Sequence, residues 1–443
     1  MNLEELKDLL REGGVVGAGG AGFPTYAKLD KRADTIILNC AECEPLLKLH
    51  RQVLERYTDD ILSALDLIAK TVGAKNVIIG IKKAYKRTFN AVESQLDSFD
   101  NMKIHALPEV YPAGDEVVLI YEATKRVVPP GKLPIDVGVT VFNVETVYNL
   151  SKLLNGHPVT HKFVSVVGEV ANPVTLNVPI GTPVSKLIEL AGGATTEDPV
   201  LIMGGPMTGN IGSEYQSVTK TTNAVIVLPA SHTLVKKKQS KTTIDIKRAM
   251  AACCQCDYCT SLCPRNLLGH PIEPSKFMLY ASNNFTKDVS PYVNSLFCCS
   301  CGLCELYSCG QGLHPRALLD ACKSGLRANG VRPPQDAEQK PVSLSREKRM
   351  VPMNRLIARL GLVAYNKPAP LKSAPVAALS VKIPLSQHIG APAVPVVAVG
   401  DLVKEGQVIA AAADKALSVN IHSSIKGEIT KISDKFITID VRN

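Results

Sequence analysis

Eight cysteines in two runs are the residues whose types and spacing most clearly indicate chemistry. The first run fits C-x2-C-x2-C-x3-C-P, and the second keeps the three-cysteine core but reaches its fourth cysteine after four residues, with no proline. Two-residue gaps let three thiolates wrap one cubane cluster, and the proline turns the chain away after the fourth. The spacing predicts two [4Fe–4S] clusters, with the candidate ligands Cys253, Cys256, Cys259, Cys263, Cys298, Cys301, Cys304 and Cys309.

In chains with two such runs, the fourth cysteine of each run ligates the cluster of the other run. The expected ligand sets are therefore Cys253, Cys256, Cys259 and Cys309 for one cluster, and Cys298, Cys301, Cys304 and Cys263 for the other. Cys254 and Cys299 each follow a first ligand and are expected to be spare thiols. Two alternatives are a pair of zinc sites, because C-x2-C also suits zinc, and a disulfide framework, which a long chain without a signal peptide disfavours.

Length and charge limit the other functions that the chain could have. Its 443 residues allow three or four domains, and its net charge of +9 is spread out apart from short basic runs at 236–238 and 346–349. Basic residues are not interleaved with aromatic ones, so no nucleic-acid partner is expected. No apolar run approaches the roughly 20 residues of a membrane span. Free cysteines and an acidic first segment indicate a cytoplasmic protein.

A glycine-rich segment near the N-terminus is the second candidate site. It follows a predicted helix over 3–10, reads Gly17–Thr25 and contains G-x-G-x-x-G. A Rossmann fingerprint would have to follow a buried strand and open a helix, and this segment does neither. Its glycine density indicates close approach of the backbone to a flat or anionic group, with a flexible loop as the alternative. A predicted strand over 35–39 then leads into Cys40–Pro45.

These segments resemble the FMN-binding region of the NADH-binding flavoprotein subunit of respiratory complex I, and equally that of the Rnf complex C subunit. The resemblance rests on Gly17–Thr25, Lys28, Asn39–Pro45, Tyr111–Glu116 and Asn143–Thr146. It implies flavin contacts from Gly19, Gly20, Lys28, Asn39, Tyr111, Gly114, Asn143 and Thr146. It also implies that NADH is the electron donor and that its nicotinamide and ribose side is shaped by Phe23, Glu42, Glu44, Asp115 and Glu116.

The rest of the chain divides by its periodicity. From His161 the chain is β-rich, with a β-β-α order that resembles a β-grasp (SLBB-like) domain, and the last segment resembles a barrel-sandwich hybrid. The predicted fold is multidomain, α/β and α+β. Its parts are an FMN/NADH-binding α/β domain over 1–155, the SLBB-like β-grasp domain over 156–235, a helical ferredoxin-like domain with two [4Fe–4S] clusters over 236–330, a linker over 331–376 and the barrel-sandwich hybrid (RnfC-N-like) domain over 377–443.

This domain order resembles the cobalamin reductases of propanediol-utilisation microcompartments, the PduS family. The resemblance implies an NADH-dependent oxidoreductase that passes electrons through FMN and both clusters to a corrinoid, without a catalytic acid or base. It further implies a corrinoid-handling partner such as an adenosyltransferase, contact with shell proteins, and a location inside a bacterial microcompartment. Two alternatives are a C-type electron-transfer subunit of an Rnf-like complex and a non-catalytic electron-transfer scaffold inside a microcompartment.

Overall fold

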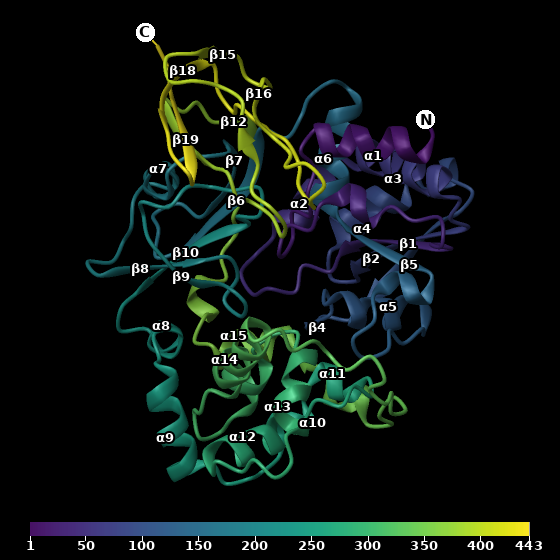
Figure 1. Cartoon of the computed structure of the whole chain (residues 1–443), viewed down its shortest axis with the longest axis vertical. Helices are drawn as coiled ribbons and strands as arrows, with labels where there is room; N and C mark the ends of the chain where they lie inside the picture. The colour runs from purple at the N-terminus through teal and green to yellow at the C-terminus, as the bar shows by residue number, and fades with distance from the viewer. Residues whose placement is uncertain (443) are drawn as a thin grey trace.

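The computed structural model describes residues 1–442 and arranges them along one long axis (Figure 1). The N-terminal α/β domain lies beside a middle β-sheet, and the C-terminal strands pack at the upper end. The helices around the cysteine runs form a lobe at the opposite end. None of the helices within residues 1–442 has both the length and the apolar character needed to span a bilayer.

A parallel four-stranded sheet in the order β3-β2-β1-β5 forms the centre of the N-terminal domain. The register pairs Asn39 with Asn143, so both asparagines reach the carboxyl edge where β1 and β5 are neighbours. The strand order reverses at this place, which is where open α/β sheets bind ligands. The elements are α1 (Leu3–Glu12), β1 (Thr35–Cys40), α2 (Leu49–Arg56), α3 (Thr58–Val72), β2 (Asn76–Lys82), α4 (Lys86–Glu93), β3 (Met102–Leu107), β4 (Val110–Tyr111), α5 (Glu116–Thr124), β5 (Val139–Asn143) and α6 (Val144–Leu154).

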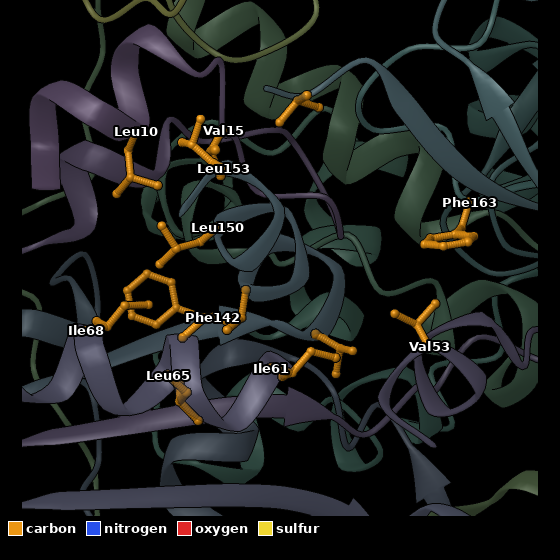
Figure 2. Packing of buried hydrophobic residues seen from close by; sticks show 14 of the residues in the cluster. Leu10, Val15, Val53, Ile61, Leu65, Ile68, Phe142, Leu150, Leu153 and Phe163 are labelled. Carbon is orange, nitrogen blue, oxygen red and sulfur yellow. The ribbon is translucent and has the colours of Figure 1, made fainter. Parts of the chain in front are cut away.

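One hydrophobic core packs α1, α3 and α6 against this sheet (Figure 2). It includes Leu10 of α1, Leu150 and Leu153 of α6 and Phe142 of β5, all of them buried. Full burial of such a side chain contributes about 1.5–3 kcal/mol. Phe163 of β6 belongs to the same cluster, so the core continues into the middle domain. The packing fixes α6, whose first turn faces the carboxyl edge of the sheet.

The middle domain is a six-stranded sheet in the order β12-β7-β6-β10-β8-β9. Its first three elements have the β-β-α order predicted from the sequence. Strand β12 comes from the segment expected to be a linker and pairs in parallel with β7, so that segment is docked on the sheet. The elements are β6 (His161–Gly168), β7 (Val174–Pro179), α7 (Val184–Leu190), β8 (Pro199–Met203), β9 (Asn210–Gly212), β10 (Ala224–Pro229) and β12 (Leu371–Pro375).

Short helices build the cysteine-rich lobe. The two cysteine runs lie mostly in the loops between them, except that Cys259 lies in a helix and Cys304 begins a π-helix over Cys304–Ser308. A two-residue strand just before the last of these helices, β11 (Val351–Pro352), pairs with β4 and ties the lobe to the N-terminal domain. The helices are α8 (Thr233–Lys238), α9 (Thr242–Ala252), α10 (Tyr258–Ser261), α11 (Pro264–Leu267), α12 (Pro274–Ser282), α13 (Ser290–Val293), α14 (Pro315–Ala328) and α15 (Met353–Arg359).

Two small sheets, β13-β19-β18-β15 and β14-β16-β17, make up the C-terminal domain. Their buried isoleucines and valines belong to the same hydrophobic cluster as the N-terminal core, so this domain is packed against its neighbours. The strands are β13 (Ser380–Pro384), β14 (Val394–Pro395), β15 (Leu402–Val403), β16 (Val408–Ala411), β17 (Ile421–His422), β18 (Gly427–Ile432) and β19 (Phe436–Asp440).

Candidate functional site

The glycine segment, the ends of β1 and β5 and the start of α5 enclose a cavity of about 280 Å3, which we call the glycine-loop cavity. It lies at the carboxyl edge of the parallel sheet, where the strand order reverses. Of the residues that the sequence predicted for flavin and NADH binding, those that line the cavity are Gly19, Phe23, Lys28, Asn39, Gly114, Glu116, Asn143 and Thr146.

Local hydrogen bonds hold the polar side chains of this cavity in place. The amide of Asn39 donates to the carbonyl of Gly114 (2.9 Å), which fixes the α5 loop against β1. The hydroxyl of Thr146 accepts the N–H of Ala18 (2.9 Å), which anchors the glycine segment on α6. The ammonium of Lys28 binds the carboxylate of Glu116 (3.0 Å), and both side chains remain partly exposed.

Bare backbone at two glycines keeps the cavity open for a flat group. A Cβ atom on Gly19 would lie 2.6 Å from Nδ2 of Asn143, so a side chain there would displace this asparagine. Gly20 has φ of +112°, which other residues rarely adopt, and no atom lies within 4 Å of its Cβ position. Amide donors, the Lys28 ammonium and the N-terminus of α6 suit a flavin ring and a phosphate. The residues present therefore fit FMN.

A histidine that was not predicted from the sequence contacts Asn143 in the lining of the cavity. The amide of Asn143 donates to Nε2 of His50 (3.2 Å). Burial lowers the pKa of His50 to about 3, so its ring is neutral and can accept this bond. The apolar residues Val141 and Phe142 also line the cavity. No motif pointed to His50, because it lies on α2, outside the segments that carry the resemblance.

Five predicted residues lie outside the lining of the cavity, and four of these use their side chains elsewhere. Gly20 adjoins the cavity through the backbone. The carboxylate of Glu42 is buried and accepts the N–H groups of His50 (3.0 Å) and Arg51 (3.3 Å) at the start of α2. Desolvation raises the pKa of Glu42. The carboxylate of Glu44 accepts the N–H of Met207 (2.8 Å), so it joins the N-terminal and middle domains.

The other two residues, Tyr111 and Asp115, reach the cysteine-rich lobe. The hydroxyl of Tyr111 donates to the carbonyl of Cys301 (2.7 Å), and Asp115 forms an ion pair with Arg265 (2.8 Å). Asp115 also caps α5 by accepting the N–H of Val118 (3.1 Å). Some of the residues predicted for the flavin and nicotinamide sites thus line the cavity, and others make contacts between domains.

The cysteines gather in two places, and each place holds one of the sets expected from spacing. The outer thiol site is a cavity of about 320 Å3 lined by Cys253, Cys256, Cys259 and Cys309. The inner thiol site surrounds a void of about 20 Å3 and is lined by Cys263, Cys298, Cys301 and Cys304. The spare thiols divide in the same way, Cys254 at the outer site and Cys299 at the inner site.

The donor chemistry of both sites suits a positively charged metal group. Burial raises the pKa of Cys259 and Cys263 to about 12, so these thiols lose their protons only when a cation offsets the charge. Four sulfurs from two loops are the donor set of a [4Fe–4S] cluster. The outer site has room for one, and the inner site offers the same number of sulfurs around a smaller void. Among residues 1–442, no three His, Cys, Asp or Glu side chains meet as ligands of a single metal ion.

The inner thiol site is the one next to the glycine-loop cavity. Gly114 and Glu116 line that cavity, and Asp115 between them binds Arg265, which lines the inner site. The order along the molecule is therefore glycine-loop cavity, inner thiol site, outer thiol site. Figure 1 shows β4 at this junction, between the N-terminal domain and the cysteine-rich lobe.

Comparison with protein families assigns four segments of the chain. Residues 10–152 match the Nuo51 FMN-binding domain and 163–210 match the SLBB domain. Residues 252–314 match the 4Fe-4S dicluster domain and 364–440 match the RnfC barrel sandwich hybrid domain. The chain thus contains an FMN-binding domain and a 4Fe-4S dicluster domain, and the fold class predicted from the sequence is confirmed.

Similar proteins extend over nearly the whole chain. Cobalamin reductase PduS of Salmonella typhimurium is 39% identical over 443 residues, which cover 99% of this chain and 97% of that protein. Cobalamin reductase PduS of Citrobacter freundii is 38% identical over 98% of this chain and 96% of that protein. The C-type component of the Na+-translocating ferredoxin:NAD+ oxidoreductase complex of Acetobacterium woodii is 30% identical, over 64% of this chain and 62% of that protein.

A solved structure shares the fold at lower identity. One chain of the NAD+-reducing [NiFe]-hydrogenase in the H2-reduced state superposes with a TM-score of 0.50 and 19% identity. The superposition covers 75% of this chain and 64% of that chain.

Proposed function

Because this chain belongs to the family of cobalamin reductase PduS, we propose that it takes electrons from NADH and passes them through FMN and two [4Fe–4S] clusters to a corrinoid. A flavin, when bound, links a two-electron hydride donor to acceptors that take one electron at a time. The chain itself binds and orients these groups, and no side chain has to act as an acid or a base.

The observation that carries this proposal is the pair of contacts between the N-terminal domain and the inner thiol site. Tyr111 ends β4 and Asp115 caps α5, on either side of the loop whose Gly114 lines the glycine-loop cavity, and they bind Cys301 and Arg265 of the cysteine-rich lobe. Electron transfer requires two redox groups to be held close together. Contacts within a few residues of both sites supply that proximity.

Different residues of the glycine-loop cavity would bind the flavin and the nicotinamide nucleotide. Asn39, Asn143 and Thr146 offer amide and hydroxyl groups to the flavin, and Lys28 offers a cation. Phe23 and Glu116 line the same cavity and would contact the nicotinamide nucleotide. Arg265 and the eight thiols at the two sites hold the clusters.

The corrinoid is proposed to approach the outer thiol site. Cys254 and Cys256 are exposed there, and Tyr258 beside them is 57% exposed, whereas the cysteines of the inner site are buried or half-buried. A large acceptor can therefore come closest at the outer end. Following the family resemblance, we also propose an adenosyltransferase and microcompartment shell proteins as partners, which copurification from a source that makes them would test.

An anaerobic assay with NADH tests the proposed function. Protein with its native cofactors is mixed with NADH and hydroxocobalamin, and the flavin and corrinoid bands are followed together. Flavin bleaching followed by formation of cob(II)alamin is the expected result. Bleaching of the flavin without corrinoid reduction would show that the corrinoid is not the substrate. A flavin that stays oxidised would show that NADH is not the donor.

A further inference from the structure

Arg265 lines the inner thiol site and also binds a residue next to the glycine-loop cavity. It is the second residue after Cys263, at the start of α11, and it lines the inner thiol site. Its Nη2 donates to Oδ2 of Asp115 (2.8 Å), in the loop that closes the glycine-loop cavity. The two side chains are only 15% and 13% exposed, so little solvent screens their charges.

One donor of this guanidinium has no partner. Nε of Arg265 is buried, and none of residues 1–442 accepts a hydrogen bond from it. A buried donor without a partner costs about 1–3 kcal/mol, so such groups generally have a reason to be retained. The adjoining cavity is lined by the four inner thiols and by Cys299. Sulfur atoms carrying negative charge at this place would satisfy the donor.

The two thiol sites differ in the charges around them. Arg265 and Arg316 line the inner site, whereas the outer site is lined by Asp257 and by no lysine or arginine. Arg316 binds Asp320 (3.1 Å) and the carbonyl of Met207 (2.9 Å), and Lys323 donates to the carbonyl of Cys298. Of these three cations near the inner site, Arg265 is the one whose buried N–H has no partner among the described residues.

We propose that Arg265 is a positioning residue that raises the reduction potential of the inner cluster by directing a buried positive charge and an N–H donor at its sulfurs. The inference deepens the proposed function and rests on its assignment of clusters to the thiols. One-electron reduction adds a negative charge to a cluster, and a nearby cation stabilises the reduced form. Asp115 orients the arginine and offsets part of its charge.

Substitution of the two partners of this ion pair should shift the reduction potential of the inner cluster in opposite directions. This outcome distinguishes an electrostatic role from a role in docking the two domains alone. Arg265→Gln removes the cation, so the inner cluster becomes harder to reduce. Asp115→Asn leaves the cation and removes the balancing anion, so the inner cluster becomes easier to reduce. Both variants lose the same contact between domains, and a merely structural role would move both in the same direction.

Anaerobic redox titration with mediators and dithionite, followed by electron paramagnetic resonance, measures the effect without NADH or corrinoid. Its outcome is therefore independent of whether the proposed donor and acceptor are right. Protein with both clusters is used, and the inner signal is assigned by its alteration in Cys301→Ser. For Arg265→Gln we expect the ratio of reduced to oxidised inner cluster at a fixed potential to fall about tenfold, a shift of about 59 mV for one electron.

Matched variants complete the test. Arg265→Lys keeps the charge, so the reduction potential of its inner cluster should lie much closer to that of the unaltered protein than to that of Arg265→Gln. Arg346→Gln breaks another buried ion pair on α5, with Glu122 (2.6 Å), without lining a thiol site, and should leave both potentials unchanged. An unchanged inner potential in Arg265→Gln, or shifts of the same sign in both partners, would overturn the proposal. If Arg265→Gln fails to assemble the inner cluster, Asp115→Asn decides: a raised potential supports the role, and an unchanged or lowered one refutes it.

Discussion

At the scale of single residues, the thiol of Cys309 tests the ligand assignment. Its run departs from the usual spacing, yet it lines the outer thiol site with the three cysteines of the other run. We predict that Cys309→Ser lowers the iron and sulfide of anaerobically prepared protein by about half, because one of two clusters is lost. Cys254→Ser, at a neighbouring exposed thiol, should keep the full content. Equal iron in all three proteins would mean that Cys309 is not a ligand.

Lys220 gives a prediction about pH. Burial lowers the pKa of this lysine to about 7, from the ordinary value of about 10.4, and its ammonium lies between the carbonyls of Gly14 (2.7 Å) and Asn420 (3.0 Å). Between these two pKa values the unfolded chain binds the extra proton. Folding stability attributable to Lys220 therefore rises with pH from about 7 to 10, by at most about 1.4 kcal/mol per pH unit.

Urea denaturation of the protein and of Lys220→Met at several pH values measures this contribution. The stability of the original protein relative to the variant should increase across the window. Two histidines face the same lysine, but burial lowers the pKa of His388 and brings that of His422 to about 3, so neither titrates above pH 7. A constant difference between the two proteins would show that Lys220 keeps its ordinary pKa when folded.

The gathering of the thiols in two places could be predicted from the sequence, because most members of each set are close in sequence, and their ligation of clusters stays a prediction. The roles of Glu44 and Asp115 could not. Their partners lie 163 residues away at Met207 and 150 residues away at Arg265, and a carboxylate after a strand can serve either a ligand or another domain. His50 was missed for the same reason, since its bond to Asn143 spans 93 residues.

At the scale of elements, the glycine segment over 17–22 should be intolerant of side chains where it meets α6. We predict that Gly19→Ala weakens FMN binding at least tenfold, because its Cβ would lie 2.6 Å from Nδ2 of Asn143. Flavin content after gel filtration and the dissociation constant for added FMN measure the loss.

Gly325→Ala on α14 is the matched control. No atom lies within 4 Å of its Cβ position, and alanine in a helix is more stable than glycine by about 0.5–1 kcal/mol. This variant should therefore keep its flavin and be slightly more stable. Retention of full flavin affinity by Gly19→Ala would remove the glycine segment from the binding site.

Elements with strong local signals matched the sequence predictions closely, and elements that depend on distant partners did not. The helix predicted over 3–10 is α1 (Leu3–Glu12), and the strand predicted over 35–39 is β1 (Thr35–Cys40). Strand β12 was not predicted, because Leu371–Pro375 is short, mostly exposed and ordered by pairing with β7 at the edge of the middle sheet. Pairing between remote segments leaves no periodicity in the sequence.

At the scale of the whole molecule, the domains converge on the loops that border the glycine-loop cavity. Glu44 joins the N-terminal and middle domains, and Asp115 joins the N-terminal domain to the cysteine-rich lobe. The C-terminal domain completes the packing, where Gly22 meets the backbone of Gln387 and His388. The arrangement positions one flavin site and two thiol sites in a fixed order.

The central claim is that electrons entering at the flavin cross the inner thiol site before they reach the corrinoid. Rapid anaerobic mixing of a Cys301→Ser variant that retains FMN with NADH and hydroxocobalamin tests it most directly. We predict that the flavin bleaches at its normal rate, while formation of cob(II)alamin slows at least tenfold relative to the unaltered protein. Corrinoid reduction at an undiminished rate in the variant would contradict the claim, because the flavin would then reduce the corrinoid without the inner cluster.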